Sequence, residues 1–166
     1  SNDTAYGLTK ANETSKNKNL ARFESIQNNF SLLNPRFLDE LSTVCKKENI
    51  SLLPYSPIGG GVLSGKYNGS FYPDNARFTA YMKNESPRVQ AQATRFVNDK
   101  TKAATAKYLE LAREYGISPV TLAVAYSKHF DFVASTIIGA RTFEQLDESL
   151  AAFKFKIDDE LLGKIE

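Results

Sequence analysis

The chain has 166 residues, of which 42% are hydrophobic and 24% are charged, a composition typical of one globular domain or of part of a larger one. The formal net charge is +2 with both signs interspersed, which gives no support to a nucleic-acid or membrane-surface partner. A single cysteine, Cys45, and a single histidine, His129, exclude a disulfide framework and a histidine-rich metal site within the chain, and they favour a reducing, cytoplasmic compartment.

Short apolar runs alternate with helical patterns along the chain. The predicted elements, in chain order, are a strand over 23–27, a helix opened by Asn34-Pro35, a strand over 50–54, a long loop from 59 to about 94, a helix over 97–115, a helix opened by Ser118-Pro119, a strand over 133–138 and a helix opened by Thr142. Strands that alternate with helices predict an α/β fold with a parallel sheet covered by helices. Three strands at most leave two open edges, so we expect part of a barrel or sheet rather than a free-standing domain. The Ser-Asn-Asp start likewise predicts a chain that is processed, tagged or cut from a longer polypeptide.

The stretch PYSPIGGGVLSGKY, residues 54–67, contains the densest group of glycines in the sequence. Three consecutive glycines at 59–61 free backbone amides to approach an anion, and Lys66 adds a positive charge. The Walker pattern is incomplete because Tyr67 stands where a hydroxyl for magnesium is required. Spacing alone therefore favours a structural loop slightly over a phosphate loop. Tyr55, at the predicted strand end, is either a stacking platform for a flat ring or a packed rim aromatic.

A second candidate site begins after Gly139, where Thr142 and Gln145 have the form of a capping box. Arg141, Gln145 and Glu148 share one face of the predicted helix. A helix N-terminus that follows a strand and a glycine is an anion site when a cation such as Arg141 supports it. A solvated polar face is the alternative, and it is the more frequent case for such a pattern.

The remaining singletons favour structural roles. Cys45 lies on an apolar helical stripe and is expected in the core. His129 lies near a helix end, where a cation suits the helix dipole. Gln27 either directs its amide into a pocket or satisfies backbone groups. No nucleophile and base can be paired within the chain.

Several motifs together resemble the aldo-keto reductase family, in order and in spacing. The markers are Ser1-Asn2, Ser25-Ile26-Gln27-Asn28, Leu32-Leu33-Asn34, Tyr55-Ser56-Pro57-Ile58, Leu63-Ser64-Gly65-Lys66-Tyr67, Arg77-Phe78, Gly116-Ile117-Ser118-Pro119, Ser135-Thr136-Ile137-Ile138-Gly139-Ala140 and Glu144-Gln145-Leu146. They cover nearly the whole chain and resemble most the branch that includes potassium-channel β-subunits and bacterial NADPH reductases.

The resemblance implies a (β/α)8 barrel with the active site at the carboxyl ends of its strands. It implies further that residues 1–166 form a single partial domain, the C-terminal half, which starts at the end of the fifth strand and supplies strands six to eight. The family's catalytic Asp, Tyr, Lys and His come from the first half. The resemblance therefore gives no residue of this chain a catalytic role, and it predicts that the chain alone is inactive.

Cofactor binding is what the resemblance assigns to this chain. It implies that Ser1, Asn2 and Gln27 hold the nicotinamide carboxamide of NADP and that Tyr55 stacks on the ring. It implies that the pyrophosphate is lined by Ser56, Ile58, Gly60, Ser64 and Lys66, with Arg77 as a looser match. At the adenosine end it places Arg141, Gln145 and Glu148, with Arg141 on the 2′-phosphate. Ser149, where the family has asparagine, implies a shorter or water-mediated adenine contact.

Three functional hypotheses follow. The first is an oxidoreductase fragment whose parent protein reduces an aldehyde or ketone with NADPH. The second is a non-catalytic NADP-binding or regulatory module. The third is a half-barrel interaction domain whose open strand edges pair with the missing N-terminal half or with a second copy. A small-molecule carbonyl substrate is expected only for the complete enzyme.

Overall fold

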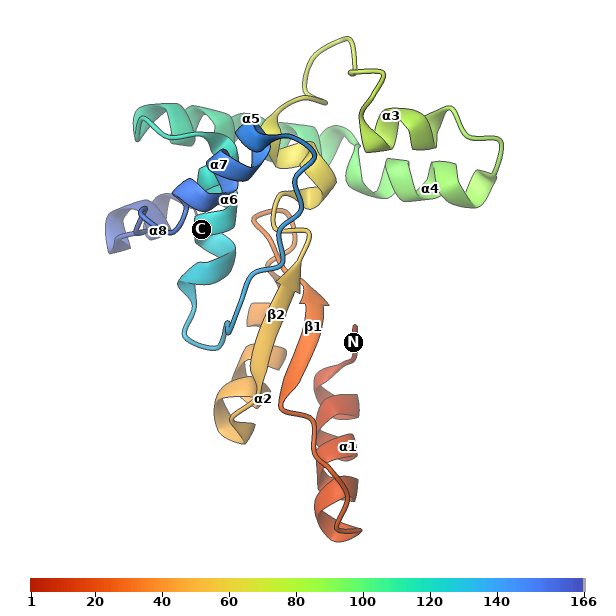
Figure 1. The fold of residues 1–166 in the computed structure, drawn as a ribbon, viewed down its shortest axis with the longest axis vertical. Coiled ribbons are helices and arrows are strands. Elements are labelled where there is room, and N and C mark those ends of the chain that lie inside the picture. Colours follow the sequence, from red (N-terminus) through yellow and green to blue (C-terminus); the bar gives the residue numbers. More distant parts are fainter. Residues whose placement is uncertain (166) are drawn as a thin grey trace.

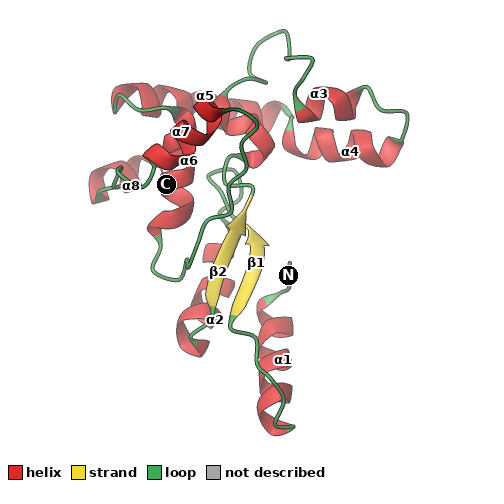
Figure 2. Cartoon of the chain, viewed as in Figure 1, coloured by secondary structure: helices red, strands yellow, loops and turns green. Residues whose placement is uncertain are grey.

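The computed structural model describes residues 1–165. Helices α1 and α2 lie beside a small parallel sheet, and most of the other helices lie toward and beyond the carboxyl ends of its strands (Figures 1 and 2). The elements are α1 (Ala5–Asn17), β1 (Ser25–Asn29), η1 (Arg36–Leu38), α2 (Leu41–Glu48), β2 (Ser51–Tyr55), η2 (Gly59–Ser64), α3 (Arg77–Met82), α4 (Pro87–Phe96), α5 (Asp99–Glu114), α6 (Pro119–His129), α7 (Phe143–Ala151) and α8 (Asp159–Ile165), where η denotes a 3-10 helix. The predicted α/β class with a parallel sheet is confirmed.

The sheet pairs β1 with β2 in parallel, in a register from Ser25 opposite Ser51 to Asn29 opposite Tyr55. The free side of β2 bonds to the chain that leads from α6 to α7, because the Leu52 N–H donates to the Phe132 carbonyl at 2.7 Å. In Figure 1 this blue segment runs beside β2 toward α7. On the other side of the sheet, the Gln27 carbonyl of β1 accepts a hydrogen bond from the Asn2 N–H. The spatial order of these segments therefore follows the order of the sequence.

The predicted strand over 133–138 is wrong as a strand. Only one isolated parallel bridge, between Leu52 and Val133, joins it to the sheet, together with a 2.9 Å bond from the Ile137 N–H to the Pro54 carbonyl. Ile137 is 40% exposed, although a central strand would bury it. Within residues 1–165 no further strand lies beyond this segment, and a segment with one neighbour lacks the second ladder that the prediction assumed.

The helices differ from the prediction in three places. The predicted loop over 59–94 contains η2, α3 and α4. The helix expected to begin at Asn34 is broken into η1 and α2, and the Asn34 side chain accepts from the side chain of Arg36 at 3.1 Å instead of capping a helix. The N-terminal helix α1 was not predicted.

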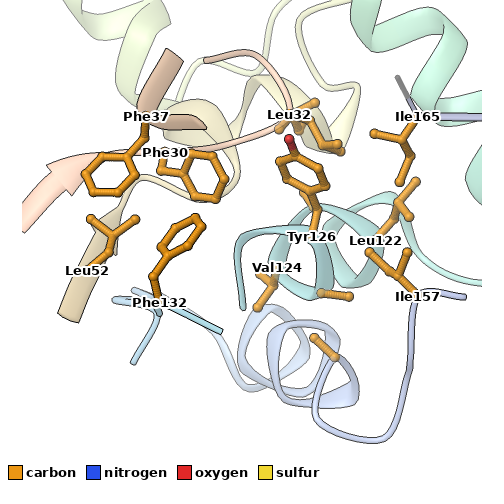
Figure 3. Close-up of a cluster of buried hydrophobic side chains, with 14 of the residues drawn as sticks. Phe30, Leu32, Phe37, Leu52, Leu122, Val124, Tyr126, Phe132, Ile157 and Ile165 are labelled. Atoms are coloured by element: carbon orange, nitrogen blue, oxygen red, sulfur yellow. The ribbon is translucent and has the colours of Figure 1, made fainter. Parts of the chain in front are cut away.

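The main hydrophobic core lies between the sheet and α6. Figure 3 shows Phe30, Phe37 and Phe132 gathered beside Leu52, with Tyr126 of α6 alongside. Phe30 and Leu52 are 0% exposed. Residues 120–127 of α6 are all buried, as the apolar pattern after Ser118-Pro119 predicts. None of the described helices has the length and apolar character that crossing a bilayer requires.

Candidate functional site

The glycine-rich loop leaves the carboxyl end of β2 and winds into η2. Ser56 has a left-handed backbone with φ of 54°, and its carbonyl accepts from the Gly59 N–H at 2.8 Å. The next turn is closed by the half-buried Ile58, whose carbonyl accepts from the Gly61 N–H at 3.0 Å. Ser64 donates its hydroxyl to the Gly61 carbonyl at 2.8 Å. Positive φ angles at the three glycines permit this winding.

Side chains of the protein itself occupy the space beside two of these glycines. A Cβ placed on Gly60 would lie 2.6 Å from the tip of the Phe78 ring, and a Cβ on Gly61 would lie 2.7 Å from Nζ of Lys66. The glycines were expected to make room for a ligand. In the structure they make room for Phe78 and for Lys66.

Lys66 forms a cationic cluster with Arg77 and Arg141. Burial lowers the pKa of Lys66, and the nearby charges of Arg77 and Arg141 lower it further. Among the ion pairs of the described residues, none involves these three cations. Three cations that stand together without a carboxylate repel one another. An anion that binds among them relieves that repulsion.

Arg141 is held in this cluster by a contact that sequence patterns do not predict. Its guanidinium donates to the carbonyl of Asn75 at 3.0 Å, across 66 residues of sequence. Asn75 lies two residues before Arg77, the first residue of α3. The contact therefore joins the turn before α7 to the residues just before α3.

The N-terminus of α7 is capped as predicted at Thr142, whose hydroxyl accepts from the Gln145 N–H at 3.4 Å. The side chain of Gln145 accepts from the Arg141 N–H at 2.9 Å, so the reciprocal bond of the predicted capping box is made one residue earlier. Arg141 and Gln145 are both exposed. Their backbone and side-chain bonds order the turn that leads into the helix.

A second group of candidate residues lies along the sheet. The Tyr55 hydroxyl, at the end of β2, donates to Oδ1 of Asn2 at 2.7 Å, and the Asn2 N–H donates to the carbonyl of Gln27 at 3.0 Å. Ser1 accepts from the Asn2 amide at 3.4 Å. The structure thus brings together all four residues that the resemblance assigned to the nicotinamide. The exposed side chain of Gln27 leaves its amide free to meet a ligand.

Two predicted adenosine contacts point elsewhere in the structure. The Glu148 carboxylate accepts from the hydroxyl of Ser118 at 2.8 Å, the residue that caps α6. Both residues line a separate hollow of about 490 Å³ between α6 and α7. Ser149 is buried, and its hydroxyl donates to the Gln145 carbonyl at 2.9 Å. Among the residues expected at the adenosine end, Arg141 therefore belongs to the cationic cluster, and Gln145 bonds to its backbone.

The residue types in this arrangement suit a phosphorylated organic ligand. Guanidinium and ammonium groups pair with phosphate oxygens, and Tyr55 presents an aromatic ring at a strand end. Among residues 1–165, no three His, Cys, Asp or Glu side chains come together to hold a metal ion. Asn75 is a part of the site that motif reasoning missed, because its role depends on a contact across 66 residues of sequence.

Comparison with known proteins supports the family resemblance seen in the sequence. A family model described as Aldo/keto reductase family matches residues 1–166. The chain is 34% identical over 166 residues to Protein tas of Escherichia coli (strain K12), which covers all of this chain and 45% of that protein. It is 28% identical over 158 residues to an aldo-keto reductase of Babesia bovis, covering 90% of this chain and 52% of that one.

A third relative is the norsolorinic acid reductase stcV of Emericella nidulans, which is 25% identical over 162 residues, 98% of this chain and 38% of that protein. The chain spans about half the length of the first two of these relatives. The family model matches every residue, and the motifs that it covers include the cationic loop, the strand-end tyrosine and the capped turn before α7. The chain belongs to the aldo/keto reductase family.

Proposed function

We propose that this chain is the C-terminal half of a (β/α)8 carbonyl reductase and supplies the binding site for its NADPH. The single observation that carries the proposal is the cluster of Lys66, Arg77 and Arg141. These cations come from the loop after β2, the start of α3 and the turn before α7, and they lie close enough for two of the charges to lower the pKa of the third. Ligands of parallel α/β folds bind beyond the carboxyl ends of the strands.

The order of the sheet supports the half-barrel. Bonds join Asn2 to β1, β1 to β2 and β2 to the segment around Val133, in the order of the sequence. A barrel winds its strands in this sequential manner, whereas a doubly wound sheet reverses direction at a switch point. Two strands and a bonded segment in sequential order, with open edges, suit one side of a larger barrel.

Exposed apolar side chains lie on elements at the two flanks of this partial sheet. Tyr6 of α1 is 77% exposed and Phe23 before β1 is 55% exposed, while Phe143 and Phe153, at and just beyond α7, are 82% and 70% exposed. Apolar groups of this size are usually covered in a complete domain. The missing half of the barrel is the partner that would cover both flanks.

The residues fit NADPH in kind. Lys66, Arg77 and Arg141 would hold its phosphates, and Tyr55 with Asn2 and Gln27 would hold its nicotinamide. The cofactor supplies a hydride for reduction of a carbonyl carbon. This chain orients the cofactor, and the proton for the carbonyl oxygen would come from the part of the barrel outside residues 1–166. The reaction class is therefore an NADPH-dependent oxidoreductase on aldehydes or ketones.

Titration of the purified chain with NADPH, followed by nucleotide fluorescence, tests the proposal. We expect saturable binding that Lys66→Met weakens by about tenfold, because one charge-assisted phosphate contact is worth about 1.5–3 kcal/mol. Lys107→Met removes the same charge from an exposed position on α5 and is the matched control. No saturable NADPH binding, or equal losses in both variants, would refute the proposed site.

A further inference from the structure

Tyr67 ties the Lys66 loop to the helix that carries Arg77. Tyr67 is 0% exposed, and its hydroxyl accepts a hydrogen bond of 3.1 Å from the N–H of Phe78, the second residue of α3. The N-cap residue of α3, Ala76, has no side-chain oxygen that could accept from this end of the helix. The Tyr67 hydroxyl therefore caps the N-terminus of α3, although Tyr67 lies outside that helix.

The ring of Phe78 is clamped on the other side by Gly60. Gly60 has φ of 66°, and an added Cβ would lie 2.6 Å from the ring tip, closer than protein packing permits. The Phe78 ring also stacks on the ring of Phe96 in α4, with centroids 5.1 Å apart. Phe78 is 3% exposed. The start of α3 is thus held by the hydrogen bond from Phe78 to Tyr67 and by the tight packing of the Phe78 ring.

Arg77 lies directly before this clamped residue. Burial raises the pKa of Tyr67, and the hydrogen bond from Phe78 and then the charge of Arg77 oppose that rise. Arg141 in turn donates to the carbonyl of Asn75. Two guanidiniums with the same charge do not remain neighbours unless the surrounding structure holds them there.

We propose that Tyr67 is a positioning residue that, together with Phe78 and Gly60, holds Arg77 beside Arg141 so that both guanidiniums receive the 2′-phosphate of NADPH. The inference rests on the proposed function, and it adds the structural basis for preferring NADPH over NADH, which lacks that phosphate. Tyr67 itself does not touch the cofactor. It acts through the backbone of α3.

The first experiment compares the buried Tyr67 with the half-buried Tyr108 in the purified chain. Tyr67→Phe keeps the ring and removes the bond to Phe78. Tyr108→Phe removes a different tyrosine–backbone bond, in which the Tyr108 hydroxyl donates to the Leu32 carbonyl at 3.3 Å, and is the control for loss of a tyrosine hydroxyl away from α3. We expect Tyr67→Phe to weaken NADPH binding by about fivefold and NADH binding by less than about twofold, in line with one lost hydrogen bond. Tyr108→Phe leaves the ratio of the two affinities unchanged.

The second experiment compares two glycines that share a left-handed backbone. Gly60→Ala forces the Phe78 ring to move. Gly116→Ala imposes similar backbone strain at φ of 65°, but an added Cβ meets nothing within 4 Å. We expect only Gly60→Ala to lower the NADPH-to-NADH affinity ratio. A loss of equal size for both nucleotides would mean that Gly60 serves the shared pyrophosphate, and it would overturn the positioning role.

A double-mutant cycle separates positioning from general stability. In an Arg77→Met background, Tyr67→Phe is expected to cause no further loss of NADPH affinity, because the group that it positions is already absent. A further loss of about fivefold in that background would overturn the proposal while leaving NADPH binding by the chain intact. If the wild-type chain binds neither NADPH nor NADH, the proposed function fails and this inference fails with it.

Discussion

The hydroxyl of Tyr55 donates a 2.7 Å hydrogen bond to Oδ1 of Asn2, and this bond joins residues 53 positions apart. Tyr55 ends β2, and Asn2 bonds through its backbone to β1. The ring of Tyr55 is therefore fixed at the sheet by its own hydroxyl. Tyr55→Phe should keep a ring for stacking but release it from Asn2.

We expect Tyr55→Phe to weaken NADPH binding by about two- to fivefold, the effect of one neutral hydrogen bond, and Tyr55→Ala to weaken it more. Asn2→Ala should weaken binding at least as much as Tyr55→Phe, because it removes the same hydrogen bond and a proposed contact to the nicotinamide. In the Asn2→Ala background, Tyr55→Phe should cause no further loss. Fluorescence titration gives the affinities. A further loss in that background would mean that the Tyr55 hydroxyl acts on cofactor binding independently of Asn2.

We expect Lys66 to give the proposed cofactor site a dependence on alkaline pH. Burial and the charges of Arg77 and Arg141 lower the pKa of Lys66, so this lysine loses its proton at a lower pH than an ordinary lysine. A bound phosphate favours the charged form and raises that pKa again. NADPH affinity should therefore fall as pH rises through the alkaline range, and binding in that range should take up protons.

Calorimetry in buffers of different ionisation enthalpy measures this proton uptake. The proton uptake that begins at the lowest alkaline pH should come from Lys66, because arginines keep their charge throughout this range. Lys66→Met should abolish it. The exposed Lys107→Met should leave it unchanged. An unchanged uptake in Lys66→Met would assign the titration to another group.

Apolar patterns predicted the centre of the fold because its elements bury apolar faces. The runs over 23–27 and 50–54 became β1 and β2 with small shifts, and Ser118-Pro119 opens α6 as predicted. The helix α1 escaped prediction because its buried face carries two polar residues, Asn12 and Ser15, beside Leu8. Asn12 is buried by exchanging hydrogen bonds with the backbone of Phe23, a long-range pairing that periodicity does not reveal.

The helices within the predicted loop were missed for a related reason. In α4 only Ala93 is buried, and the glycines that wind η2 read as loop residues. These segments pack on a second cluster around Val62, Tyr67 and Phe78, which forms only when the chain has folded. The cationic cluster has the same origin, because the bond from Arg141 to Asn75 spans 66 residues. Family resemblance suggested its members, and local spacing favoured the ordinary alternatives.

Cys45 offers a test of the core that is independent of the cofactor. It is 1% exposed, and burial raises the pKa of its thiol from 9.0 to about 11. The unfolded chain therefore releases this proton at a lower pH than the folded chain. The contribution to stability is complete below pH 9 and is lost as pH rises toward 11, since the folded state then holds more protons than the unfolded state.

At about 1.4 kcal/mol per pH unit, this loss reaches roughly 2–3 kcal/mol. We expect Cys45→Ala to be less stable than the wild type at neutral pH because of the cavity and to approach it above pH 10. Urea unfolding at several pH values measures the difference. Parallel pH profiles would show that the thiol ionises equally in both states.

The exposed flanks predict how the purified chain behaves by itself. Phe143 and Phe153 near α7 are 82% and 70% exposed, and they have no cover within the described residues. We expect the chain to self-associate at high concentration, as measured by sedimentation velocity, and Phe143→Ser with Phe153→Ser to reduce that association. The control is Phe71→Ser, which removes an aromatic side chain that is 91% exposed on the loop before α3. Tyr81 is unsuitable as a control because its ring packs on Phe78.

The same chain should show no NADPH-dependent reduction of an aromatic aldehyde, because the proposed function places proton donation outside residues 1–166. Loss of NADPH absorbance measures the reaction, and saturable cofactor binding in the same sample shows that the site is folded. Binding without turnover is the outcome that the half-barrel requires, since orientation of the cofactor and transfer of the proton then belong to different parts of one barrel. Turnover by the chain alone would place a proton donor among its own residues and would contradict that division.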